Sequence, residues 1–155
     1  SPLWLGFVLA LLVWEAIPWA LSLLTFRYGW AAAYPGSWNL LGLIPVSAGT
    51  IGLLWGLLLH SAQTPKRLTW APAMSYLLQD GPYSFSRNPM YLSELILMLG
   101  WVIFYGSVAV LIGFVVWWAF FNFFQIPQEE RVMEASFAEA YRAYKNKVPR
   151  WLGKP

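Results

Sequence analysis

Residues 80–94 of the chain read Asp-Gly-Pro-Tyr-Ser-Phe-Ser-Arg-Asn-Pro-Met-Tyr-Leu-Ser-Glu, the densest cluster of polar and turn-forming residues in an otherwise apolar sequence. Gly81-Pro82 is typical of a turn. Pro89 disfavours helical backbone at Asn88 and suits the first turn of a helix, where its missing N–H loses no hydrogen bond. The stretch therefore predicts a loop that ends near Asn88 and a membrane helix that begins near Pro89.

Polar side chains gather at the predicted start of that helix, namely those of Arg87, Asn88, Tyr91 and Glu94. Tyr91 and Glu94 are three residues apart and therefore share a helix face. A helix N-terminus also offers unpaired N–H groups and partial positive charge to an anion. From spacing alone, the cluster fits a binding site or, equally, a juxtamembrane loop with an aromatic anchor and one interfacial arginine.

The composition indicates an integral membrane protein. Of the 155 residues, 59% are hydrophobic and 11% are charged, far from the average of soluble proteins. The chain has no cysteine, which excludes disulfides and thiolate metal sites, and the single histidine, His60, excludes a histidine metal cluster. We expect no metal site and no nucleic-acid partner.

Apolar segments predict an all-α fold with about four transmembrane helices in a single domain, 1–155. The predicted spans are residues 3–24, 39–60, 89–105 and 107–126. Of the 10 lysines and arginines, only Arg27 lies on one side of these spans. The positive-inside rule then predicts that both termini and the basic regions are cytoplasmic. We expect a multi-pass protein of the bacterial inner membrane, in contact with membrane lipids.

Two features of the first two segments stand out. Glu15 lies near the middle of a predicted span, where a charge costs about 2.5–3.5 kcal/mol or more, so it is a candidate functional residue. The alternative is a protonated or hydrogen-bonded acid that holds helices together. Gly42, Gly49 and Gly56 recur every seven residues, which predicts close packing of helix backbones. Pro18 is expected to bend the first helix.

Residues 61–88, which include Lys66-Arg67 and the apolar run Tyr76-Leu77-Leu78, form the longest connection. Loops of this length are usually functional or disordered, and its apolar content argues against disorder. His60 precedes it at the predicted interface, where a lone histidine is usually hydrated, and we do not expect it to act as a base. The aromatic end of the fourth segment fits an interfacial belt or a wall for an acyl or prenyl chain.

The C-terminal region predicts an amphipathic cytoplasmic helix over residues 128–146. Apolar side chains recur at spacings of four, four, three and four, at Met133, Phe137, Tyr141, Tyr144 and Val148. At about 100° per residue, Glu129 and Glu130 flank this stripe on opposite sides. Acids in a first helical turn are explained by the helix dipole, but that effect does not explain why two acids bracket the apolar face. Such a pair suits a bound cation or hydroxyl groups.

These motifs resemble, in order, the signature of the isoprenylcysteine carboxyl methyltransferase and phospholipid methyltransferase superfamily, over about residues 62–152. The matching elements are Gly81-Pro82-Tyr83, Arg87-Asn88-Pro89-Met90-Tyr91, Glu129-Glu130, the two tyrosines that follow, and Val148-Pro149-Arg150. One position departs, because many carboxyl methyltransferase relatives have histidine where this chain has Asn88.

The resemblance implies an S-adenosylmethionine cofactor held by the acidic pair and the Arg-x-Pro-x-Tyr region. Carried over, it implies a cofactor pocket formed by Gln79, Gly81, Pro82, Tyr83, Arg87, Asn88, Tyr91, Glu129, Glu130 and Tyr141. Candidate catalytic residues are Glu94 and Glu15 as proton acceptors, with water as the third possible acceptor, and Arg87 to seat a carboxylate. A carboxylate acceptor needs no base, whereas an amine or phenol does.

We therefore expect a membrane methyltransferase whose lipophilic acceptor enters from the bilayer, an isoprenylcysteine-type carboxylate or a phospholipid amine. A lipid phenol and a small thiol are also compatible with the sequence. No G-x-G-x-x-G motif follows a strand pattern, so a Rossmann-type methyltransferase is not expected. Two alternatives stay open: a nicotinamide-dependent membrane reductase of the sterol-reductase type, and a non-enzymatic scaffold. The oligomeric state is not predicted.

Overall fold

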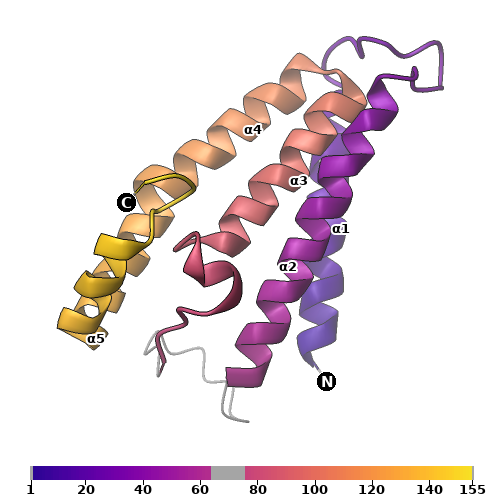
Figure 1. Ribbon diagram of the computed structural model, residues 1–155. Helices are drawn as coiled ribbons and strands as arrows, with labels where there is room; N and C mark the ends of the chain where they lie inside the picture. Colours follow the sequence, from indigo (N-terminus) through magenta and orange to yellow (C-terminus); the bar gives the residue numbers. More distant parts are fainter. Residues whose placement is uncertain (1, 64–75, 155) are drawn as a thin grey trace. The chain divides into compact units, whose positions relative to one another are not determined.

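The computed structural model describes residues 2–63 and 76–154, and within these ranges the backbone is helical apart from its connections and two isolated bridges (Figure 1). Lys66 and Arg67, the charged pair of the 61–88 connection, lie outside the described residues. The elements are α1 Pro2–Ser22, η1 Asn39–Gly42, α2 Leu43–Gln63, η2 Gly81–Ser84, α3 Pro89–Tyr105, α4 Val108–Phe120, η3 Phe121–Gln125 and α5 Ile126–Lys147. The predicted all-α class is confirmed.

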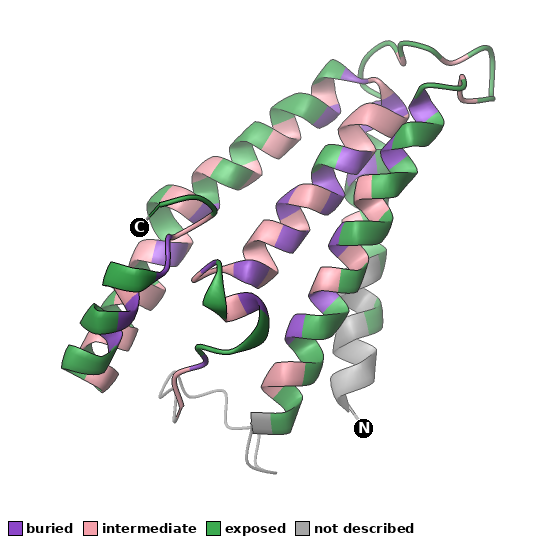
Figure 2. Ribbon diagram, in the orientation of Figure 1, coloured by how far each residue is buried: buried purple, intermediate pink, exposed green. Residues whose placement is uncertain are grey.

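Among the described residues, two helical stretches are long and apolar enough to cross a membrane, Asn39–Ala62 and Val108–Lys147, and α3 is apolar but shorter. Much of α4 is coloured as exposed in Figure 2. Its exposed large apolar residues include Ile112, which is 58% exposed, and Val116, which is 60% exposed. Such a surface is unfavourable in water but suits contact with lipid tails. The protein is therefore a membrane protein, while the count of four spans stays a prediction.

The chain divides into two compact units, Ser1–Gly49 with Leu95–Trp118, and Thr50–Glu94 with Ala119–Pro155. In the first unit, Asn39 is fully buried and its Nδ2 donates hydrogen bonds to the carbonyls of Tyr28, Ile103 and Phe104. A buried amide needs hydrogen-bond partners. Here the partners lie in the connection after α1 and at the end of α3, so the bonds hold these two segments together.

Glycines allow close helix packing in each unit. A Cβ placed on Gly42 would meet the backbone oxygen of Gly100 and lie 2.6 Å from the Phe104 nitrogen, all in the first unit. In the second unit, a Cβ on Gly56 would lie 2.7 Å from Met90 Cγ. Gly42 and Gly56 of the predicted repeat therefore mark close approaches to α3, as small residues do in membrane helices.

The boundary between the fourth span and the C-terminal helix differs from the prediction. Instead of a span that ends at residue 126 and a separate helix from residue 128, the helix runs on through the π-helical turn Phe121–Gln125 into α5. Pro127 has no N–H for the carbonyl of Phe123 and its ring crowds the preceding turn. A wider π turn just before the proline accommodates it.

The amphipathic helix predicted over residues 128–146 is present but interrupted, because α5 reverses at Ala138, where φ is 41° and ψ is −112°. Lys145 Nζ lies 2.7 Å from Glu134 Oε1, whereas 11 residues of straight helix would separate them by about 16 Å. Figure 1 shows the last part of α5 alongside its first part. The predicted apolar stripe still comes together, as a cluster of Tyr141, Tyr144 and Val148 with Leu77, Met133 and Phe137.

Candidate active site

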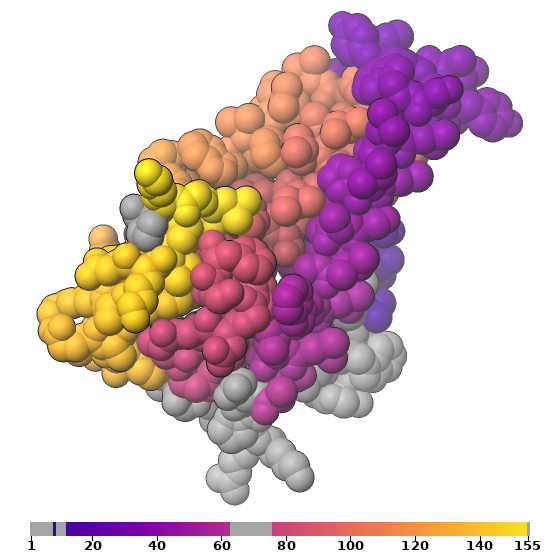
Figure 3. All heavy atoms as spheres, viewed as in Figure 1, coloured from indigo at the N-terminus to yellow at the C-terminus, as the bar shows by residue number. Residues whose placement is uncertain are grey.

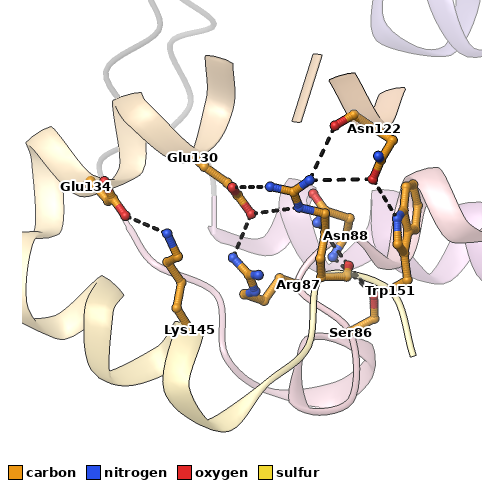
Figure 4. A network of polar contacts seen from close by, with 9 residues as sticks. Ser86, Arg87, Asn88, Asn122, Glu130, Glu134, Lys145 and Trp151 are labelled. Carbon is orange, nitrogen blue, oxygen red and sulfur yellow. Dashed lines mark hydrogen bonds and ion pairs between the residues drawn. The ribbon is translucent and has the colours of Figure 1, made fainter. Parts of the chain in front are cut away.

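The second unit contains a buried ion-pair network centred on Glu130 (Figure 4). Arg87 Nη1 lies 2.6 Å from Glu130 Oε1, and Arg150 Nη2 lies 2.7 Å from Glu130 Oε2. The side chains of Arg87 and Glu130 are only 11% and 12% exposed. Arg87 comes from the loop before α3, Glu130 from α5 and Arg150 from the C-terminal segment, so one carboxylate joins three separate parts of the chain.

Backbone contacts hold the C-terminal segment against the loop before α3. The Arg87 N–H donates to the Pro149 carbonyl at 2.9 Å, and Asn88 Nδ2 donates to the Arg150 carbonyl at 3.0 Å. Ser86 Oγ donates to the same carbonyl at 3.3 Å. Figure 3 shows the yellow C-terminal residues packed against the rose-coloured residues near position 80. The Val-Pro-Arg motif thus supports the loop that carries Arg87 and Asn88.

Glu129 has a different environment from Glu130. Its Oε1 accepts hydrogen bonds from Tyr91 Oη and from Gln125 Nε2, the latter at 2.7 Å. The Tyr91 ring also contacts the Phe121 ring, with centroids 4.4 Å apart. Within residues 2–63 and 76–154, no lysine or arginine forms an ion pair with Glu129. The site therefore presents one carboxylate neutralised by arginines and a second that is held only by neutral donors.

A histidine and tyrosines form the other side of the site. His60 Nδ1 lies 2.9 Å from Tyr76 Oη, and His60 Nε2 lies 2.6 Å from Tyr83 Oη. Tyr144 Oη donates to the Tyr83 carbonyl at 2.6 Å. Burial raises the pKa of the Tyr83 phenol well above its usual range, and the neighbouring Tyr144, Tyr76 and Glu129 raise it further. Tyr83 therefore stays protonated at neutral pH.

These groups line one cavity of about 230 Å³. The lining residues are His60, Tyr76, Leu78, Tyr83, Arg87, Asn88, Met90, Tyr91, Glu94, Glu129, Glu130, Met133, Tyr141 and Tyr144. A concave pocket with an apolar lining and a few convergent polar groups is the usual form of a small-molecule site.

Most of the residues predicted to form the site line this cavity. They are Tyr83, Arg87, Asn88, Tyr91, Glu94, Glu129, Glu130 and Tyr141. Gln79, Gly81 and Pro82 do not line it; Gln79 is exposed, whereas Gly81, with a φ of 58°, and the buried Pro82 form the turn that presents Tyr83. Glu15 belongs to the other unit, on an exposed face of α1, and is not part of this cavity.

Three residues that line the cavity, His60, Tyr76 and Tyr144, were not predicted to belong to the site. Tyr144 was predicted as part of the apolar stripe; it also lines the cavity, and its hydroxyl donates to the Tyr83 carbonyl. His60 looked isolated because its partners lie 16 and 23 residues away in the sequence. A pattern that could have found it is a histidine at the end of a span followed by tyrosines in the polar connection.

The polar groups of the cavity fit a ligand that carries both a cation and a carboxylate. Glu129 lacks a cationic partner among the described residues, and Arg87 Nε is a buried donor with no hydrogen-bond partner there. Buried donors and charged groups are normally paired. The amino-acid part of S-adenosylmethionine has an ammonium and a carboxylate, so the residues present fit this cofactor.

A sequence model of the family described as "Phospholipid methyltransferase" matches residues 57–140. The chain therefore belongs to the phospholipid methyltransferase family, and the resemblance inferred from the two motifs is confirmed. This membership indicates a methyltransferase, a class whose usual methyl donor is S-adenosylmethionine.

The chain is also similar to two curated proteins. An uncharacterised protein of Haemophilus influenzae is 41% identical over 63 residues, which cover 41% of this chain and all of that protein. A protein-S-isoprenylcysteine O-methyltransferase of Schizosaccharomyces pombe is 35% identical over 74 residues, which cover 47% of this chain and 31% of that protein. The chain thus spans less than a third of the length of this second relative. No solved structure gives a significant match.

Proposed function

We propose that the protein transfers a methyl group from S-adenosylmethionine to a lipophilic acceptor, a phospholipid amine. The observation that carries the proposal is the unequal pair of acids in one cavity: Glu130 is held by Arg87 and Arg150, while Glu129 has no cationic partner among the described residues. The family match supports methyl transfer.

In this proposal Glu129 binds the cationic part of the cofactor and Arg87 binds its carboxylate. Tyr91 and Gln125 orient the Glu129 carboxylate, since both donate to its Oε1. Glu130 and Arg150 fix the guanidinium of Arg87 in turn. When bound, S-adenosylmethionine supplies an activated methyl group, and the protein contributes mainly alignment, which can provide several kcal/mol.

The charge of the cavity favours an amine over a carboxylate as the acceptor. Its lining includes three carboxylates, from Glu94, Glu129 and Glu130, and one guanidinium, from Arg87. That guanidinium already pairs with Glu130 at 2.6 Å. An acid-rich site attracts an ammonium group and repels a second carboxylate. An isoprenylcysteine-type carboxylate is therefore the second candidate acceptor.

We further propose that the acceptor enters from the bilayer and that the cavity faces the cytoplasm of a bacterial inner membrane. Nine of the ten basic residues would lie on that side if the chain has four spans. The cofactor is water-soluble and the acceptor is lipid-soluble, so a site at the cytoplasmic surface of the membrane gives both access.

The test is incubation of the purified protein with methyl-labelled S-adenosylmethionine and a membrane lipid extract, followed by identification of the labelled lipid. The proposal predicts a labelled amine headgroup. A labelled carboxyl ester would instead support the isoprenylcysteine-type acceptor. An absence of any labelled product would contradict the proposal and favour the scaffold, whereas binding of a reduced nicotinamide, followed by fluorescence, would favour the reductase.

A further inference from the structure

The tyrosine–histidine–tyrosine chain of the cavity has a geometry suited to moving a proton. Both nitrogens of His60 lie within hydrogen-bond distance of phenol oxygens, Tyr76 Oη at 2.9 Å and Tyr83 Oη at 2.6 Å. A neutral imidazole donates from one nitrogen and accepts at the other. One phenol therefore donates its proton to His60, and the other accepts a proton from it.

His60 can take up a proton without breaking either contact. An imidazolium donates from both nitrogens, so the phenol that had been the donor becomes an acceptor as its hydroxyl hydrogen is replaced. When Tyr83 is that phenol, a proton that reaches its oxygen from the cavity displaces its own proton onto His60 Nε2. Tyr83 is neutral before and after, which agrees with the burial that disfavours its phenolate.

We propose that His60 is the terminal proton acceptor for methylation of an amine and that Tyr83 relays the proton to it. The inference rests on the proposed function. The bound ammonium first gives up one N–H proton. The electron pair freed on nitrogen then forms the carbon–nitrogen bond as the carbon–sulfur bond breaks with its electrons left on sulfur. The ammonium proton passes to the Tyr83 oxygen, the Tyr83 proton passes to His60 Nε2, and His60 later returns it to solvent.

The titratable groups that act on His60 include the phenols of Tyr76 and Tyr83 and the carboxylate of Glu129. Since a base must be neutral to accept a proton, amine methylation falls as the pH drops through the pKa of His60. A carboxylate acceptor releases no proton and does not need His60.

The experiment uses the full chain in lipid nanodiscs, as wild type, His60→Gln and Tyr83→Phe, with Tyr34→Phe as control because Tyr34 is 77% exposed and belongs to the other unit. Glutamine can donate and accept hydrogen bonds as a neutral imidazole does, but it is not basic. The acceptor probes are phosphatidylethanolamine and N-acetyl-S-farnesylcysteine. Binding of S-adenosylhomocysteine is measured by calorimetry for each variant.

The proposal predicts that His60→Gln lowers the rate of phosphatidylethanolamine methylation by about 100-fold or more. The rate that remains in this variant should no longer decrease at acid pH. Binding of S-adenosylhomocysteine and methylation of the farnesylcysteine carboxylate stay within about threefold of wild type, as for the control. The chain has 1 histidine, so nitrogen NMR of labelled imidazole reports His60 alone. We expect its pKa to match the acid limb of the wild-type rate, and Tyr83→Phe to shift its Nε2 resonance.

Equal loss with both acceptors, or an unchanged rate and pH profile in His60→Gln, would overturn the proton-acceptor role and leave the proposed function intact. An Nε2 resonance that does not respond to Tyr83→Phe would also overturn the proton-acceptor role. This measurement does not depend on His60→Gln, so it can still be made if that variant fails to fold. Methylation of the carboxylate probe alone by wild type would overturn that role as well. Failure of wild type to bind S-adenosylhomocysteine would instead refute the proposed function, and this inference with it.

Discussion

Glu130 is the residue that joins the separate parts of the second unit, and its role in stability can be separated from ligand binding. Removal of its side chain leaves two arginines, Arg87 and Arg150, without their carboxylate. Because Arg87 is nearly buried, we predict that Glu130→Ala destabilises the protein by about 3 kcal/mol. Thermal unfolding in detergent, followed by circular dichroism, measures this loss.

The matched control is Glu139→Ala, on the same helix. Glu139 pairs with Arg142 at 2.7 Å, but its side chain is 86% exposed. Exposed pairs contribute about 0–1 kcal/mol, so this variant should unfold close to the wild-type temperature. Equal shifts for the two variants would show that the Glu130 network does not stabilise the fold.

At the scale of single residues, local patterns predicted the acids and the arginine but not the partners. The flanking positions of Glu129 and Glu130 followed from helical spacing. That Glu130 takes both arginines, while Glu129 takes Tyr91 and Gln125, depends on contacts across 43, 20, 38 and 4 positions. No spacing rule distinguishes two adjacent glutamates in this way.

Among the elements, α3 was predicted with its observed ends, Pro89 and Tyr105. A proline marks its start and Gly106, with a φ of 56°, follows its end, and both are strong local signals. The reversal of α5 had no such signal. Alanine has the highest helix propensity, so Ala138 predicts continuation, and packing of Tyr141 and Tyr144 overrides that preference.

This reversal gives a test at the level of the element. Ala138 has a positive φ of 41°, which is unfavourable for a residue with a Cβ, and glycine relieves that strain. We predict that Ala138→Gly stabilises the protein by about 1 kcal/mol, net of the extra flexibility of glycine. Thermal unfolding in detergent measures the gain.

Ala143 provides the comparison, because it lies in the helical turn after the reversal and is exposed. At such a position, glycine costs about 1 kcal/mol relative to alanine. The two substitutions should therefore change the unfolding temperature in opposite directions. A loss of stability in both would indicate that α5 continues as a helix through Ala138.

For the whole molecule, the proposed orientation in the membrane rests on the distribution of basic residues. The chain has 0 cysteines, so single cysteines can report which side of the membrane a residue faces. Tyr34 and Leu152 are 77% and 60% exposed. With four spans and the positive-inside rule, Tyr34→Cys should react with an impermeant maleimide outside intact cells.

Leu152→Cys should react only after the membrane is permeabilised. Labelling of both positions in intact cells would rule out a cytoplasmic C-terminal site. It would also remove the basis for placing the cavity where a water-soluble cofactor of the cytoplasm can reach it.

The central claim is that Glu129 binds the cationic part of S-adenosylmethionine, while Glu130 forms the ion pair that fixes Arg87. Calorimetric titration of S-adenosylmethionine into wild type, Glu129→Gln and the exposed control Glu139→Gln tests it. A hydrogen bond to a charged group contributes about 1.5–3 kcal/mol, so Glu129→Gln should weaken binding by about 10–100-fold. Glu139→Gln should bind like wild type, and equal affinity of all three proteins would contradict the account.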